Sequence, residues 1–357
     1  MTVHSASVLR QVDQVNHGAA YEDGKHKGRS RMNFQQTKSI LRGSLAVGSI
    51  LCGAPALAQA TVQPSSAASL LEGSDDIIVT AQRREERLRD VPISIDVLDE
   101  EELENRRIYS IDDLGTAVPG PSIQSLGGYT RTIAVRGASN SFGRSALIGM
   151  YLDEASVSSY PAYMQPDLQT HDLERVEVLK GPQGTLYGEG SAGGTIRFIT
   201  RSPKLDAFGF EAYGALALTE DGAPSQRLQT VLNLPVVTDR LALRVAGSYA
   251  HEGGWIDQPN ANAKNINDQD LVNVRVRALW RPDSRFTANI TAIIHRGDGP
   301  PNRGEDEDGN YSQVLGLTTI PDGEDDYDFY NATLSYELGQ VRVLSTSTYL
   351  DQQKPLR

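Results

Sequence analysis

Strict alternation of apolar and polar side chains dominates the sequence from about residue 208 to residue 350. Residues 272–280, 286–294 and 330–338 each place an apolar side chain at every second position. Because successive side chains of a β-strand point to opposite faces, this period predicts strands with one apolar and one polar face. We predict seven such strands, at about residues 208–218, 226–234, 241–250, 271–280, 286–295, 329–338 and 341–350.

The connections between these predicted strands differ in length. Short turns at residues 235–240, 281–285 and 339–340 alternate with longer loops. A membrane β-barrel has this arrangement, with short periplasmic turns and long extracellular loops. A soluble β-sandwich gives similar alternation along its strands, and the strands alone would favour it. Features of the N-terminal part of the chain are therefore needed to distinguish the membrane barrel from the soluble sandwich.

The longest predicted loop, residues 296–328, contains two acidic clusters, at residues 305–308 and 324–326. Clustered carboxylates can bind a hard cation such as Ca²⁺. The spacing of these acidic residues fits no EF-hand loop. We therefore predict a solvated loop and no metal site.

Residues 32–60 have the layout of a secretory signal peptide. Lys38 and Arg42 supply the positive charge, residues 43–57 form a short apolar core, and Ala58-Gln59-Ala60 provides a cleavage site with small residues. A buried core helix is the alternative interpretation of the apolar stretch. The layout of the whole segment favours export.

The residues on either side of this segment carry no periodic pattern. Residues 1–31 are polar and of mixed charge, and we interpret them as a non-native or misassigned extension, with translation starting at Met32. Residues 61–74 are rich in Gln, Pro, Ser and Ala, which predicts a disordered linker.

Export makes a testable prediction. We expect the mature, exported protein to begin at Thr61, because cleavage should follow Ala60. N-terminal sequencing measures this directly. A mature N-terminus upstream of Gly43 would contradict it.

The only cysteine, Cys52, lies within this predicted signal peptide. The exported chain should therefore contain no thiol. Disulfide frameworks, cysteine-based zinc sites and cysteine nucleophiles are all excluded by this interpretation.

Residues 83–205 predict a small α+β domain. Strand-like runs occur at residues 91–98, 132–136, 146–152, 175–179 and 195–200. A single helical stretch should start at the N-cap Asp99, with Glu102 at capping-box spacing, include Leu103 and Leu114 on its apolar face, and end at Pro119-Gly120-Pro121.

Gly188-Glu189-Gly190-Ser191-Ala192-Gly193 matches the G-x-G-x-x-G pattern of dinucleotide-binding folds. That chemistry requires a helix directly after the glycines, because the helix N-terminus receives the pyrophosphate. Residues 195–200 are instead strand-like and rich in β-branched side chains. We predict that the glycines form tight turns and that no nucleotide cofactor binds, which weakens the interpretation of the chain as a secreted oxidoreductase.

Five segments of this region occur in a characteristic order: residues 75–82, 90–95, 134–137, 149–153 and 173–188. In this order they resemble the TonB box and plug domain of TonB-dependent outer-membrane receptors. The resemblance implies a TonB box at residues 75–82, a plug at 83–205 and the start of a transmembrane barrel at 206–357. The implied fold class is a partial membrane β-barrel of about seven antiparallel strands, preceded by a small α+β plug domain.

The length of the predicted barrel region is short for this family. Plugged outer-membrane transporters have roughly 22 strands, and only about a third of that number is predicted here. An open sheet edge cannot be satisfied in lipid. We therefore expect the barrel to be truncated in this chain.

The resemblance also implies function and partners. Receptors of this family import scarce nutrients, most often ferric siderophores, and the TonB complex moves the plug to open a path. The implied partners are TonB, a small-molecule substrate and outer-membrane lipid, in the outer membrane of a Gram-negative cell. The residues expected to bind TonB are Asp76, Ile77, Ile78, Val79, Thr80 and Ala81.

Two further sets of residues follow from the resemblance. Two plug arginines of the family pair with barrel glutamates, and Arg136 and Lys180 occupy the matching positions. Lys180 departs from the family, since lysine cannot form a bidentate fork with a carboxylate. The family's partner glutamates lie beyond the first barrel strands, so we expect neither residue to have an acidic barrel partner here. The residues expected at substrate-facing plug apices are Tyr129, Arg131, Tyr160 and Tyr163.

Charge and side-chain chemistry exclude other functions. The chain has 34 Lys and Arg against 46 Asp and Glu, a formal net charge of −12, which argues against binding to nucleic acid. The six His residues are scattered and no nucleophile, base and acid occur at catalytic spacing. We predict that the protein is not an enzyme and uses no cofactor. A secreted or periplasmic β-rich binding protein without transport is the alternative.

Overall fold

The computed structural model describes residues 77–125, 130–140, 145–159, 162, 164–188, 190–299 and 323–353. The predicted signal peptide and linker lie outside these residues, as do Asp76, the acidic cluster at 305–308 and the predicted apical residues Tyr129, Tyr160 and Tyr163.

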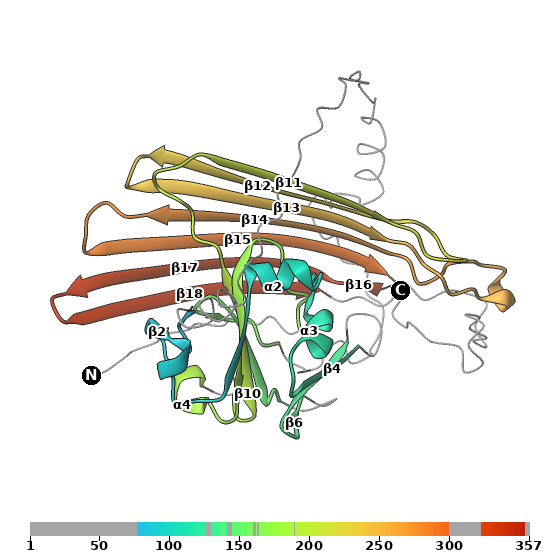
Figure 1. The fold of residues 1–357 in the computed structure, drawn as a ribbon, viewed down its shortest axis with the longest axis horizontal. Coiled ribbons are helices and arrows are strands. Elements are labelled where there is room, and N and C mark those ends of the chain that lie inside the picture. Colours follow the sequence, from blue (N-terminus) through green and yellow to red (C-terminus); the bar gives the residue numbers. More distant parts are fainter. Residues whose placement is uncertain are drawn as a thin grey trace, which may run out of the picture. The chain divides into compact units, whose positions relative to one another are not determined.

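The C-terminal part of the chain is one antiparallel sheet of long strands, which run side by side in Figure 1. All seven predicted strands are present, and most extend a few residues beyond the predicted ends. They follow the order of the sequence, β11-β12-β13-β14-β15-β17-β18, with the short β16 (Gly323–Glu324) beside β15. Their bounds are β11 (Gly209–Ala217), β12 (Ser225–Val237), β13 (Leu241–Glu252), β14 (Gln269–Trp280), β15 (Phe286–Gly299), β17 (Asp326–Leu338) and β18 (Val341–Gln353).

The two faces of this sheet are inverted relative to a soluble sandwich. Large apolar side chains are exposed on one face, including Leu216 at 84% and Ile290 at 53%. The other face buries charged and polar side chains, among them Arg244, Arg275 and Asn331. An apolar outer face and a polar inner face belong to a membrane barrel, whereas a sandwich turns its apolar faces inward. Among the described residues, no helix is long and apolar enough to cross a membrane.

The plug is built on a five-stranded mixed sheet in the order β3-β9-β10-β7-β8. Strand β10 is parallel to β7 and antiparallel to β9, and its residues are almost entirely buried. A second sheet of three strands has the order β4-β5-β6. The bounds of these strands are β3 (Ile95–Asp99), β4 (Pro121–Ser125), β5 (Arg131–Val135), β6 (Ala138–Ser139), β7 (Ile148–Leu152), β8 (Ala155–Ser156), β9 (Leu173–Lys180) and β10 (Gly194–Thr200).

The single helix predicted after Asp99 is wrong, because the chain forms two short helices there. The helix α2 (Glu100–Asn105) begins as expected, since the Asp99 carboxylate accepts the N–H of Glu102 at 2.8 Å. The helix α3 (Ile111–Ala117) starts anew at Ser110, where Asp113 completes a capping box. A second N-cap inside a helical pattern marks the start of a new helix. The prediction overlooked it because the apolar residues keep helical spacing across the break. The other helical elements of the described residues are the short helix α4 (Gly184–Tyr187) and two 3₁₀ segments, η1 (Leu88–Asp90) and η2 (Pro259–Ala261).

The glycine-rich stretch forms turns, as predicted. The short helix α4 (Gly184–Tyr187) precedes the stretch and strand β10 follows it, so no helix N-terminus faces the glycines. Gly188 and Gly190 have φ angles of +69° and +88°, a region that favours glycine. At Gly193 a Cβ atom would lie 2.2 Å from the Cβ of Ala138, so close packing also requires glycine there.

Candidate functional site

The predicted TonB box is part of a hairpin that packs on the plug. Strand β1 (Ile78–Val79) pairs antiparallel with β2 (Glu86–Arg87). Val79 and Ala81 have no exposed surface, whereas Ile78 is 45% exposed. The buried pair joins an apolar cluster that contains Val91, Tyr151, Leu179 and Tyr187. The segment is therefore seated on the plug by alternate side chains.

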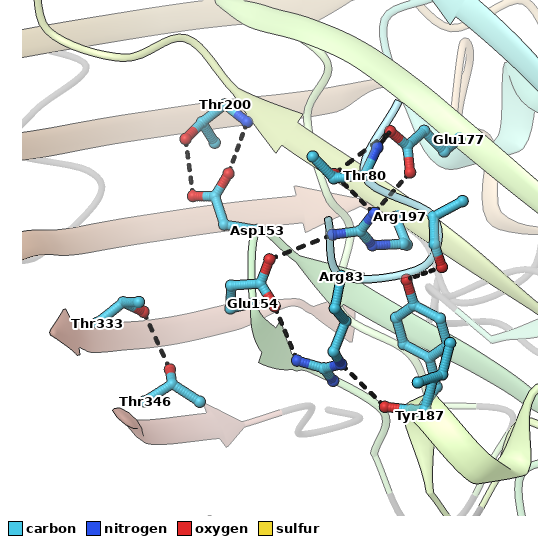
Figure 2. A network of polar contacts seen from close by, with 12 residues as sticks. Thr80, Arg83, Asp153, Glu154, Glu177, Tyr187, Arg197, Thr200, Thr333 and Thr346 are labelled. Carbon is cyan, nitrogen blue, oxygen red and sulfur yellow. Dashed lines mark hydrogen bonds and ion pairs between the residues drawn. The ribbon is translucent and has the colours of Figure 1, made fainter. Parts of the chain in front are cut away.

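Thr80 lies at the centre of a polar network (Figure 2). Its backbone N–H donates to the Oε1 of Glu177 at 3.0 Å. Its hydroxyl oxygen accepts from the Nη1 of Arg197 at 2.9 Å and from the Nη2 of Arg175 at 3.2 Å. One residue of the predicted TonB box thus touches three charged side chains of the plug sheet.

Glu177 and Arg197 form a fully buried ion pair between strands β9 and β10, with 2.6 Å between Oε2 and Nη1. Arg175 adds a second contact to Glu177 at 2.8 Å, and Glu154 lies 3.4 Å from the other side of Arg197. Burial acts to lower the pKa of Arg197, but Glu177, Tyr187 and Glu154 together raise that pKa above its ordinary value. The pair is charged and holds the two central strands together.

Arg83, in the turn of the hairpin, makes a second set of contacts with the plug (Figure 2). It donates to Glu154 at 2.7 Å and to the carbonyl oxygen of Leu186 at 2.9 Å, and its guanidinium lies 5.0 Å from the ring centre of Tyr187. The Tyr187 hydroxyl donates to the carbonyl oxygen of Ala81 at 2.7 Å, and burial raises the pKa of Tyr187 to about 12. Arg83, Thr80 and Ala81 thus fasten the hairpin, and we call these contacts the latch.

The two predicted anchoring residues, Arg136 and Lys180, bind within the plug. Arg136 donates to Ser94 Oγ at 2.8 Å and to the carbonyl oxygen of Lys180 at 3.4 Å. Lys180 forms an ion pair with Asp96. Among the described residues, no ion pair joins either of them to a barrel carboxylate. Their anchoring role stays a prediction.

An ion-pair contact joins the plug to the barrel sheet, and its charges are reversed relative to the predicted anchor of plug cations and barrel carboxylates. The plug residue Asp172 has a side chain that is 2% exposed, and its carboxylate receives Arg244 of β13 at 2.6 Å and Arg275 of β14 at 3.4 Å. Arg275 also donates to the carbonyl oxygens of His171 and Asp172. Here the plug supplies the carboxylate and the barrel supplies the arginines.

A third barrel arginine, Arg277, extends this contact. It donates to the carbonyl oxygen of Thr200 at 2.7 Å and lies 3.8 Å from Asp153. Asp153 in turn accepts both the N–H and the hydroxyl of Thr200 (Figure 2). None of these residues was predicted as a site residue from the sequence. Their signal was the presence of arginines on the polar face of predicted strands, at 244, 275 and 277.

The prediction that Arg131 faces substrate is wrong. Its side chain is 2% exposed and pairs with Asp112 at 2.7 Å and Asp167 at 3.2 Å. Burial acts to lower its pKa, but the charges of Asp167 and Asp112 raise the pKa above its ordinary value. Arg131, the first residue of β5, therefore connects this strand to Asp112 of α3 and to Asp167.

Comparison with known proteins agrees with this architecture. Residues 87–195 match the model of the TonB-dependent receptor plug domain. The iron-regulated outer membrane virulence protein of Vibrio cholerae is 28% identical over 179 residues, covering 48% of this chain and 27% of that protein. The vitamin B12 transporter BtuB of Vibrio vulnificus is 26% identical over 187 residues, covering 52% of this chain and 29% of that protein. The chain thus spans less than a third of the length of these relatives.

The fold has solved counterparts. The ferric yersiniabactin uptake receptor FyuA of Yersinia pestis superposes with a TM-score of 0.64 and 20% identity, covering 74% of this chain and 41% of that one. The siderophore receptor PiuA of Acinetobacter baumannii gives a TM-score of 0.62 and 20% identity, covering 79% and 39%.

The plug sheet, the inverted barrel sheet and these likenesses define the plug and barrel architecture of outer-membrane receptors. Residues 87–195 belong to the plug domains of TonB-dependent receptors. The relatives of this chain are receptors of the Gram-negative outer membrane, and that is the location of this protein.

Proposed function

We propose that the receptor containing this chain imports a scarce nutrient, a ferric siderophore, when TonB pulls on residues 76–81. The observation that carries the proposal is the bond from Thr80 to the Glu177–Arg197 ion pair. A pull on residues 76–81 acts directly on the pair that joins β9 to β10. Force applied to residues 76–81 therefore reaches strands β9 and β10 of the plug sheet.

The substrate class rests on the relatives. Their names include an iron-regulated outer membrane protein, a ferric yersiniabactin receptor and a siderophore receptor, against one vitamin B12 transporter. Growth of a receptor-deficient strain on ferric siderophores as sole iron source, with uptake of cobalamin measured in parallel, tests this assignment.

The alternative, a periplasmic β-rich binding protein, is disfavoured by the exposed apolar face of the sheet. Side chains such as Leu216 at 84% and Leu338 at 57% would face water in such a protein. In an outer-membrane receptor they face lipid.

The role of the predicted TonB box has a direct test. TonB should add a strand to this segment, and proline removes a backbone donor and fixes φ. In the full-length receptor, Ile78→Pro or Val79→Pro should abolish uptake and leave substrate binding intact. The measurements are uptake of radioactive iron and equilibrium binding of the ferric siderophore to whole cells.

A matched control separates backbone from side-chain effects. Ile78→Thr keeps the backbone N–H and a β-branched side chain, so it should preserve most uptake. Normal uptake by either proline variant would contradict the proposed coupling role.

A further inference from the structure

Three buried arginines lie together on the inner face of the barrel sheet: Arg244 of β13 and Arg275 and Arg277 of β14, here called the arginine cluster. Arg244 and Arg277 are directly opposite each other across the two strands, and Arg275 shares their face because side chains alternate along a strand. The three residues are 4%, 5% and 8% exposed. Like charges directly opposite in a sheet destabilise it, so the cluster requires anions close by.

The plug supplies these anions. Among the described residues, the ion-pair partners of the cluster are Asp172, which receives Arg244 and Arg275, and Asp153, which lies 3.8 Å from Arg277. Asp153 directly follows β7 and Asp172 directly precedes β9, so both lie at the same end of the plug sheet. The charge that compensates the arginine cluster therefore belongs to the domain that the proposed function requires to move.

The barrel sheet has acidic side chains on the same inner face, but they pair with other arginines. Strand register and alternation place them on that face. In the described strands they form three pairs: Glu211 with Arg201 at 3.6 Å, Glu252 with Arg227 at 3.0 Å and Glu337 with Arg342 at 3.4 Å. When the plug moves away, this wall therefore keeps the arginine cluster and loses the carboxylates that compensate it.

Resting on the proposed function, we propose that the arginine cluster selects an anionic cargo, which passes this wall in place of Asp172 and Asp153. A charged lining between low-dielectric walls concentrates ions of the opposite sign, and pores lined by Arg or Lys favour anions. The planar guanidinium group binds paired oxygen atoms of an anion in a bidentate fork. An iron chelate with a net negative charge fits this wall, whereas a cationic chelate is repelled by it.

The charge of the wall can be measured as ion selectivity, with chloride and potassium as the probes. The full-length receptor is inserted into a planar bilayer under a KCl gradient. Urea then releases the plug, while the barrel stays folded because its backbone groups are paired within a closed sheet in lipid. In the triple variant Arg244→Gln/Arg275→Gln/Arg277→Gln, the ratio of chloride to potassium permeability, obtained from the reversal potential, should fall about 10-fold.

Two further variants separate charge from structure. The triple variant with lysine at the same three positions keeps the positive charge and should keep the permeability ratio. Glu337→Gln/Arg342→Gln is the matched control, because it removes one charge of each sign from the same face and should leave the ratio unchanged.

Salt provides a second readout of the same charge. The difference between the unmodified receptor and the glutamine triple variant should shrink between about 0.1 M and about 1 M KCl, because the Debye length falls from about 10 Å to about 3 Å.

Two results would overturn the proposal. One is an equal permeability ratio in the unmodified receptor and the glutamine triple variant, and the other is a cargo that migrates as a cation in electrophoresis at neutral pH. The selectivity measurement uses no siderophore, so it is independent of the growth test. A receptor that supports growth on no ferric siderophore would refute the proposed function, and the permeability ratios would still report the charge of the wall.

Discussion

Replacing Asp172 with asparagine should loosen the plug from the barrel in the full-length receptor. The change leaves Arg244 and Arg275, both nearly buried, without their carboxylate. Removing one partner of a buried ion pair costs about 3–5 kcal/mol, because the remaining charge stays buried and uncompensated. Hydrogen exchange of the plug strands, followed by mass spectrometry, should show faster exchange in β9 and β10 by a factor that corresponds to this loss.

Two further variants make this test specific. Asp206 is an exposed aspartate of the same chain, and Asp206→Asn should leave exchange unchanged. The double variant Asp172→Asn/Arg244→Gln removes one of the uncompensated charges and should recover part of the loss. Exchange rates in Asp172→Asn equal to those of the unmodified receptor would show that the plug is held elsewhere.

Replacing Glu177 with glutamine should destabilise the interior of the plug. Arg197 has no exposed side-chain surface, and Glu177 is its closest carboxylate partner, at 2.6 Å against 3.4 Å for Glu154. We expect the free energy of plug unfolding to fall by about 3–5 kcal/mol. Chemical denaturation of the full-length receptor, with exchange read at β9 and β10, measures this change.

Glu174→Gln is the control, since Glu174 lies on the same strand with its side chain 52% exposed. An exposed ion pair is worth at most about 1 kcal/mol, so this variant should stay close to the unmodified receptor. Equal destabilisation by the two variants would mean that burial of the Glu177–Arg197 pair does not matter.

The two carboxylates have different tasks. Asp172 joins the plug to strands β13 and β14, whereas Glu177 joins two strands of the plug to each other and to Thr80. Asp172→Asn should therefore affect docking and leave the latch intact, and Glu177→Gln should affect both the plug sheet and the latch. Comparison of exchange at the Thr80 amide in the two variants separates these effects.

The sequence by itself determined the local elements. The period of two at residues 272–280 and 330–338 predicted strands, because alternation is a property of each strand alone. The β-branched residues 195–200 predicted a strand and not a helix after the glycines, and this indicated that the glycines form turns. The break between α2 and α3 was also a local signal, Ser110 with Asp113, and the apolar spacing hid it.

Only the tertiary structure decided the pairing of charges. Asp172 meets Arg244 across 72 positions and Thr80 meets Glu177 across 97, and no local pattern encodes such distances. The same holds for Arg131. It was predicted to face substrate at a plug apex, and it is buried between Asp112 and Asp167. A strand period tells which side chains share a face, but it does not tell what lies against that face. Here the opposing surface is the plug, whose carboxylates allow the inner face of the barrel sheet to bury arginines.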